Sequence, residues 1–187
     1  MNVVPVDHTR RLWAIYDLLG EEKKNYILGL PWNTFAWSRG GGQETWPRRL
    51  IDPDVPEVML ASGWICECLS DINQALGTKF SRSWGIWWLD EPGFSCNLHT
   101  DGHLPNAMQI FWVSPNNSDQ YGTGFYHYKN SSNSYIRHQF YSRPNNGYLM
   151  LNHAEPDGSQ PLQWHAMLNI VPENTWRLSS YWFFECD

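Results

Sequence analysis

The sequence predicts a mainly β fold with helices near its N-terminus, and three observations lead to this prediction. Two stretches before residue 80 have apolar residues at intervals of three and four. After Thr78 the pattern changes to short aromatic and β-branched runs separated by turn residues. The chain has 187 residues, 42% of them hydrophobic, which suits one domain with a substantial core. We therefore expect a single domain over residues 1–187, with 1–80 as helical support and 81–187 as the β core.

The helical stretches are residues 7–20 and residues 54–76. Each places its apolar side chains on one face of a helix, and the second has the longer and more regular pattern. A glycine, Gly20 or Gly77, can end each helix. Between them, residues 21–52 contain prolines and three consecutive glycines, so we expect this segment to be irregular.

The rest of the chain predicts strands, because each run is rich in residues that favour strands and ends at a Pro, Gly or Asn turn. The candidate strands are Ser83–Leu89, Phe94–His99, Ala107–Val113, Thr123–Tyr128, Ile136–Tyr141, Gly147–Leu151, His165–Val171 and Thr175–Phe184. Short strands in this number fit a double-stranded β-helix, also described as a jelly roll or cupin-like barrel.

Bulk properties exclude several classes. No apolar stretch reaches the roughly 18 residues of a membrane helix, and the N-terminus has no signal-peptide pattern, so we expect a cytoplasmic protein. The net charge of −6 argues against broad binding to nucleic acids or membrane surfaces. The four cysteines do not form the pattern of a disulfide framework.

Three residues form a candidate metal site. His99 and Asp101 lie one residue apart, so an extended chain presents both side chains on one face. A later histidine, His165, can complete a set of two imidazoles and one carboxylate. This set leaves coordination positions open and marks non-haem Fe(II) oxygenases. The His-x-Asp triplet alone is a weak signal, since a structural histidine beside an unrelated aspartate gives the same letters.

Arg177 strengthens the metal interpretation. It lies 12 residues after His165, far enough for a turn and a returning strand. Its guanidinium can bind a carboxylate through two hydrogen bonds. Ser179 lies two residues further on and so shares the strand face of Arg177. A buried arginine without an anion is costly, so an inward Arg177 implies a carboxylate partner. The alternative is an arginine on the outer surface.

Four short motifs resemble the Fe(II)/2-oxoglutarate-dependent oxygenase family. They are Asn97-Leu98-His99-Thr100-Asp101-Gly102, Gly122-Thr123-Gly124-Phe125, Trp164-His165-Ala166 and Arg177-Leu178-Ser179. The segment 177–184 is most similar to the prolyl-hydroxylase branch. The resemblance implies a double-stranded β-helix in which His99, Asp101 and His165 bind Fe(II). It also implies that Arg177 and Ser179 bind the distal carboxylate of 2-oxoglutarate.

Four other histidines are rival ligands: His103, His127, His138 and His153. The first begins a loop, and the next two lie outside the ligand positions that the resemblance implies. His153 is the strongest rival because it lies 12 residues before His165. Residues 37–49 and 116–135 are either flaps over the site or ordinary surface loops.

The resemblance implies a dioxygenase that uses dioxygen and 2-oxoglutarate, hydroxylates a C–H bond and releases succinate and CO2. It favours a protein or peptide side chain, or a free amino acid, as substrate. A nucleic-acid substrate is less favoured because no basic run accompanies the site. Fe(II), Asp101, Arg177 and doubly charged 2-oxoglutarate together are neutral, which suits a closed cavity.

Two other classes remain open. A non-catalytic jelly roll that binds a carbohydrate or other small molecule would also be rich in tryptophan. A cupin-like metalloenzyme that does not use 2-oxoglutarate would keep the metal ligands without needing Arg177 and Ser179.

Overall fold

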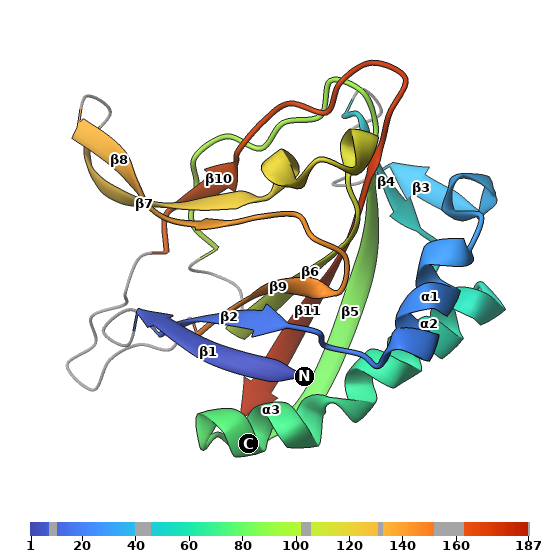
Figure 1. Ribbon diagram of the computed structural model, residues 1–187, viewed down its shortest axis with the longest axis horizontal. Helices are drawn as coiled ribbons and strands as arrows, with labels where there is room; N and C mark the ends of the chain where they lie inside the picture. Colours follow the sequence, from blue (N-terminus) through green and yellow to red (C-terminus); the bar gives the residue numbers. More distant parts are fainter. Residues whose placement is uncertain (8–10, 40–45, 102–105, 131–132, 152–162, 187) are drawn as a thin grey trace.

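The computed structural model describes residues 1–7, 11–39, 46–101, 106–130, 133–151 and 163–186 (Figure 1). Its strands are β1 (Asn2–Asp7), β2 (Leu12–Tyr16), β3 (Trp37–Arg39), β4 (Arg48–Ile51), β5 (Phe80–Asp90), β6 (Asn106–Val113), β7 (Thr123–Asn130), β8 (Asn133–Phe140), β9 (Asn146–Met150), β10 (His165–Met167) and β11 (Arg177–Cys186). Its helices are α1 (Glu21–Gly29), α2 (Pro56–Glu67) and α3 (Leu69–Leu76), with 3-10 turns η2 (Trp32–Thr34), η4 (Pro115–Asn117) and η5 (Asp119–Tyr121).

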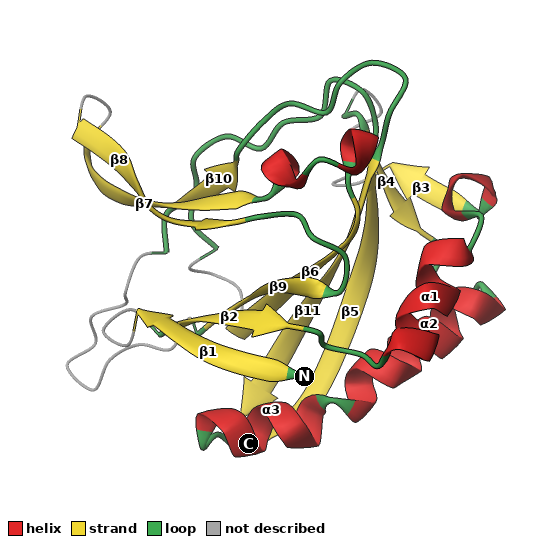
Figure 2. Ribbon diagram, viewed as in Figure 1, coloured by secondary structure: helices red, strands yellow, loops and turns green. Residues whose placement is uncertain are grey.

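The described strands form two antiparallel sheets. The large sheet has the strand order β1-β2-β9-β6-β11-β5-β4-β3, and the small sheet has the order β10-β7-β8. Figure 2 shows the helices gathered on one side of the large sheet, while β7 and β8 extend from the other side. The predicted double-stranded β-helix is therefore confirmed. Of its predicted strands, only Phe94–His99 is not a strand here, because that segment makes a single bridge, His99 to His165.

The alternation of side chains along the strands builds two separate cores. On β6, Met108, Ile110 and Trp112 pack toward the helices, whereas Ala107 and Phe111 pack between the two sheets. Fully buried tryptophans concentrate in the helix-side core, as Trp32, Trp87, Trp112 and Trp182. The interior between the sheets also contains the cavity described below. The central strands β9, β6 and β11 of the large sheet are thus buried on both faces.

The predicted helix over residues 7–20 is wrong, because this segment contributes to β1 and β2. Leu12 and Ala14 pack between the sheets while Ile15 packs toward the helices, so β2 is apolar on both faces. Apolar residues on both faces imitate helical spacing. Pairing with β9, from Leu12 opposite Met150 onward, satisfies the backbone of β2 as a strand.

Helical support over residues 1–80 is also corrected in part. Strands β1 and β2 extend one edge of the large sheet, and β3 and β4 extend the other. The expected irregular segment 21–52 contains α1, β3 and β4. The expected helix over 54–76 is two helices, α2 and α3, which meet at Cys68.

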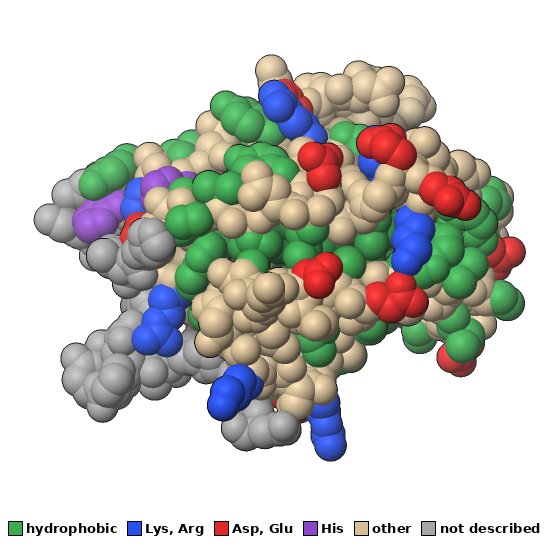
Figure 3. All heavy atoms as spheres, turned by 60° about the horizontal axis from the view of Figure 1, so that its bottom comes forward, with side chains coloured by type: hydrophobic (Ala, Val, Ile, Leu, Met, Phe, Trp, Pro, Cys, Tyr) green, Lys and Arg blue, Asp and Glu red, His purple; other side chains and the backbone are tan. Residues whose placement is uncertain are grey.

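The surface shows the acidic side chains that give the chain its net charge of −6 (Figure 3). Acidic side chains gather on the right-hand part of the face in Figure 3, where Figure 1 places α1 and α2. Cys66, Cys68 and Cys96 are free thiols, in line with the absence of a disulfide pattern. Within the described residues, every helix is too short or too polar to cross a lipid bilayer.

Candidate metal centre

The backbone brings the two histidines of the predicted site together. The His99 amide donates to the His165 carbonyl at 3.0 Å, and the reciprocal bond is 2.9 Å. Asp101 follows two residues after His99 on the same segment. One carboxylate oxygen of Asp101 lies 3.5 Å from His99 Nε2, and the other lies 3.4 Å from His165 Nε2. One ligand atom from each of the three residues lies within 4.8 Å of the others, which is close enough to share one ion.

Both imidazole rings are oriented by hydrogen bonds to the backbone. His99 Nδ1 lies 2.7 Å from the Asn97 carbonyl oxygen, and His165 Nδ1 lies 2.8 Å from that of Gln163. Since a carbonyl only accepts, each Nδ1 carries a hydrogen, which leaves Nε2, on the Asp101 side of each ring, as the nitrogen that can bind a metal ion. Metal-binding histidines in proteins have the same arrangement. Two imidazole nitrogens and a carboxylate fit a divalent transition metal such as Fe(II).

Asp101 is held as an anion by its neighbours. Burial raises the pKa of its carboxyl group, but His165, Tyr181 and His99 outweigh burial and lower the pKa to about 2. Tyr181 donates its hydroxyl hydrogen to Asp101 at 2.7 Å. The contact with Cys96, opposed by burial, raises the pKa of His99 to about 9. A metal ion therefore has to displace a proton from His99 at neutral pH.

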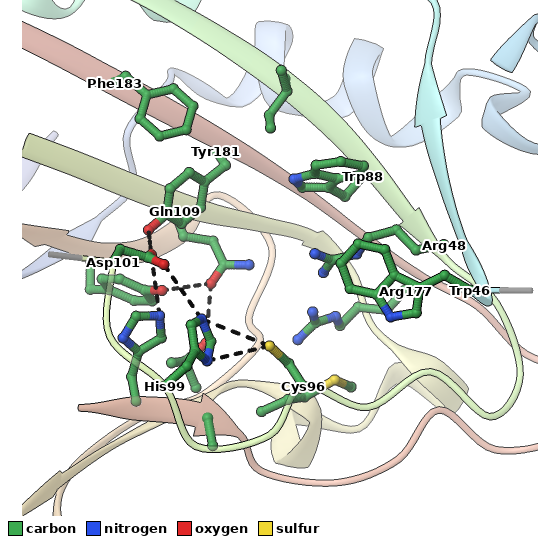
Figure 4. Close-up of a pocket in the computed structure, with 16 residues that line it drawn as sticks. Trp46, Arg48, Trp88, Cys96, His99, Asp101, Gln109, Arg177, Tyr181 and Phe183 are labelled. Atoms are coloured by element: carbon green, nitrogen blue, oxygen red, sulfur yellow. Dashed lines mark hydrogen bonds and ion pairs between the residues drawn. The ribbon is translucent and has the colours of Figure 1, made fainter. Parts of the chain in front are cut away.

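The site opens into a cavity of about 280 Å³ between the two sheets. Its lining residues are Trp46, Arg48, Ile86, Trp88, Cys96, His99, Asp101, Gln109, Thr123, Tyr148, His165, Ala166, Met167, Arg177, Tyr181 and Phe183. Figure 4 shows His99 and Asp101 at one end of this cavity and the two guanidinium groups of Arg48 and Arg177 at the other. The cavity thus has a metal-ligating end and a cationic end.

Arg177 is buried and points into the cavity. Its Nε and Nη2 lie 2.7 Å and 2.6 Å from one carboxylate oxygen of Asp90, and its Nη1 donates to the Tyr121 carbonyl at 2.7 Å. The anion beside Arg177 is therefore supplied by this chain, through the fully buried Asp90. These contacts use three of the five N–H hydrogens of the guanidinium. Within the described part of the chain, hydrogens remain on its terminal nitrogens for a second acceptor.

Ser179 lies next to the cavity but does not line it. Its hydroxyl accepts a hydrogen bond from Gln109 Nε2 at 3.1 Å. The side-chain oxygen Oε1 of Gln109 in turn accepts hydrogen bonds from the hydroxyls of Thr123 at 3.1 Å and Tyr148 at 2.9 Å. Gln109 therefore stands between Ser179 and the cavity, and these hydrogen bonds fix its amide group.

Sequence reasoning missed Arg48, Asp90 and Gln109. A signal existed for Asp90, since it is a charged residue that ends an otherwise aromatic and aliphatic run. No local signal marks Arg48 or Gln109, because only the pairing of distant strands brings them to the cavity.

Two rival histidines have other contacts. The ring of His127 stacks on Tyr135, and His138 lies 3.6 Å from the carboxylate of Asp7. Neither lines the cavity. His103 and His153 lie outside the described residues. Of the two candidate flaps, residues 37–49 contribute Trp46 and Arg48 to the cavity, and residues 116–135 contribute Thr123.

Comparisons of sequence give no relative, since no family model matches this chain and no curated protein matches it. Comparison with solved structures finds similar proteins. A prolyl-4-hydroxylase from Pseudomonas putida aligns with a TM-score of 0.62 at 14% identity, over 96% of this chain and 94% of that one. A prolyl hydroxylase from Trichoplax adhaerens was solved with a hypoxia-inducible-factor peptide. It aligns with a TM-score of 0.61 at 12% identity, over 94% of this chain and 84% of that one.

A third similar structure is HygX from Streptomyces hygroscopicus, solved with nickel, 2-oxoglutarate and hygromycin B. It aligns with a TM-score of 0.57 at 11% identity, over 93% of this chain and 82% of that one. At these identities the likeness establishes the fold. The chain has the double-stranded β-helix fold of the prolyl hydroxylases and other 2-oxoglutarate/Fe(II) oxygenases.

Proposed function

We propose that this protein is an Fe(II)- and 2-oxoglutarate-dependent dioxygenase that hydroxylates a C–H bond of a protein or peptide side chain, or of a free amino acid. One observation carries the proposal. Two histidines and an aspartate with converging ligand atoms share a cavity with a buried arginine whose bonds to other described residues leave some of its hydrogen-bond donors unused.

His99, Asp101 and His165 would hold the metal. When bound, Fe(II) with 2-oxoglutarate and dioxygen would supply the oxidising chemistry, yielding succinate and CO2. The backbone carbonyls behind both rings and the hydroxyl of Tyr181 keep the three ligands in place before the metal arrives. Three protein ligands leave coordination positions for the co-substrates.

Arg177 would bind the distal carboxylate of 2-oxoglutarate. Its remaining N–H groups can donate to a carboxylate in a buried, water-poor setting, where charge-assisted hydrogen bonds are strong. Ser179 would act through Gln109, whose amide it fixes, rather than by contact with the co-substrate. The charge balance expected from the sequence is preserved, since Asp90 and Arg48 add one negative and one positive charge.

The substrate class is supported by analogy. The Trichoplax neighbour was solved with a peptide, which favours a peptide side chain. HygX was solved with hygromycin B, which keeps a small-molecule substrate as the second candidate. Incubating the loaded protein with proline-containing peptides and with free amino acids would separate these candidates. The readouts are succinate formation and a mass gain of one oxygen atom.

The first test is binding without oxygen. Fe(II) followed by 2-oxoglutarate should produce the weak visible charge-transfer band of a chelated 2-oxo acid. His165→Ala should remove the band, and Arg177→Ala should weaken 2-oxoglutarate binding while Fe(II) still binds. His138→Ala is the matched control, because this histidine contacts Asp7 away from the cavity. Iron binding without any band would favour a metalloenzyme that does not use 2-oxoglutarate, and no iron binding would favour a non-catalytic binding protein.

A further inference from the structure

A row of three charged side chains crosses adjacent strands at the cationic end of the cavity. Asp90 on β5 lies opposite Arg48 on β4 and opposite Arg177 on β11. Arg177 holds one carboxylate oxygen of Asp90, and Arg48 Nε holds the other at 2.5 Å. One buried carboxylate thus bridges two guanidinium groups. All three side chains are buried or nearly so, at 0% exposure for Asp90, 3% for Arg177 and 12% for Arg48.

The row carries one net positive charge. Burial raises the pKa of Asp90, but Arg48 and Arg177 outweigh burial and hold the pKa below its ordinary value, so Asp90 is an anion. Asp90 and Arg177 alone would be neutral as a pair, and a dianionic ligand would then meet no net cation at this end. Arg48 restores the positive charge.

Aromatic rings hold Arg48 in place without adding an anion. Its guanidinium carbon lies 4.0 Å, 4.8 Å and 5.3 Å from the ring centres of Phe94, Trp88 and Trp46. Among the described contacts, only its Nε–H has a hydrogen-bond acceptor. Its terminal nitrogens border the cavity beside those of Arg177 (Figure 4). They are placed to donate to an anion that enters there.

We propose that Arg48 is a second cationic residue for the co-substrate, which binds the distal carboxylate together with Arg177 and sets a preference for dicarboxylic over monocarboxylic 2-oxo acids. This inference rests on the proposed function. It assigns the net charge of the pocket to a residue on β4 and gives Asp90 the role of positioning both arginines.

The test measures binding of 2-oxoglutarate and of 2-oxopentanoate, which has the same chain length without the distal carboxylate. Titrations would follow tryptophan fluorescence of the Mn(II)-loaded protein, since Trp46 and Trp88 line the cavity. Arg48→Gln should weaken 2-oxoglutarate binding by about 10- to 100-fold, the range for loss of a charged hydrogen-bonding partner, and leave 2-oxopentanoate binding little changed. Arg49→Gln is the matched control, because the neighbouring Arg49 pairs with Glu91 instead.

A double variant separates charge from structure. Arg48→Gln with Asp90→Asn removes one charge of each sign, leaves Arg177 as the net cation, and should recover much of the lost 2-oxoglutarate affinity. A further loss in the double variant would overturn the inference. If Arg48→Gln folds poorly, Arg48→Met can replace it, because methionine preserves the packing against the rings. Arg48→Met should show the same selective loss of 2-oxoglutarate binding.

The outcomes also separate this inference from the proposed function. If Arg177→Gln weakens 2-oxoglutarate binding and Arg48→Gln does not, the role of Arg48 is refuted and the proposed function stands. If the unaltered protein binds Mn(II) but neither 2-oxo acid, both are refuted.

Discussion

Replacing Gln109 with methionine tests how the cavity wall is held together. Gln109 makes three side-chain hydrogen bonds, to Ser179, Thr123 and Tyr148. Each of these four residues is at most 6% exposed, so water has little access to replace the lost bonds. Methionine has a similar length but offers no comparable donor or acceptor.

The expected loss follows from the number of bonds. A buried hydrogen bond contributes about 1 kcal/mol net, so the three together contribute about 3 kcal/mol. A contact between the hydroxyls of Thr123 and Tyr148 can offset part of this loss after the substitution. We therefore expect Gln109→Met to lower the free energy of unfolding by about 2–3 kcal/mol.

Urea denaturation of the metal-free protein would measure this value. With a slope of about 2 kcal/mol per molar urea, the midpoint should fall by about 1–1.5 M. Ser180→Ala is the control, since it removes a single buried partner, the acceptor for Trp112 Nε1, on the other face of the sheet. A Gln109→Met midpoint that falls no further than that of Ser180→Ala would refute the expected contribution of three hydrogen bonds by Gln109.

Two further predictions concern the metal site and the sheet. The pKa of His99 is about 9 in the metal-free protein, so metal affinity should rise about tenfold per pH unit from pH 6.5 to 9. Cys96→Ala should lower the pH at which this rise ends from 9 toward 6.5, because the contact with Cys96 raises the pKa of His99. Calorimetric titration with the metal across this pH range would measure both effects. The same raised pKa stabilises the metal-free fold below pH 6.5, and that stabilisation is lost as pH rises through 9. Gly147→Ala should destabilise the protein by about 3 kcal/mol or prevent folding, because a Cβ there would lie 1.8 Å from the backbone carbonyl oxygen of Gln109. Thermal unfolding would measure this loss, and Gly63→Ala on α2, where nothing lies within 4 Å, should instead be neutral or stabilising.

The sequence predicted the features that depend on local order. Alternation along the last strand places Arg177 and Tyr181 on the cavity face, and the His-x-Asp spacing places His99 and Asp101 together. Both follow from the period of an extended chain, which is a local property.

The features that were missed depend on which strands pair. The role of Asp90 comes from its position opposite Arg48 and Arg177, which lie 42 and 87 residues away in the chain. Helical spacing in residues 7–20 was misleading because β2 is buried on both faces. Such a strand shows no apolar-polar alternation, so its pairing with β9 decides its structure.

The N-terminal strands have a consequence for folding. Strand β2 pairs with β9, and β4 pairs with β5, so the two halves of the N-terminal segment close opposite edges of the barrel's sheet. Leu12 meets Met150 only after most of the chain has been made, and loop closure over such distances slows folding. Until both ends dock, β5 and β9 expose unpaired backbone along two edges, where another chain can add. A fragment that begins at residue 81 would keep both edges open, and it should aggregate rather than fold as an independent barrel.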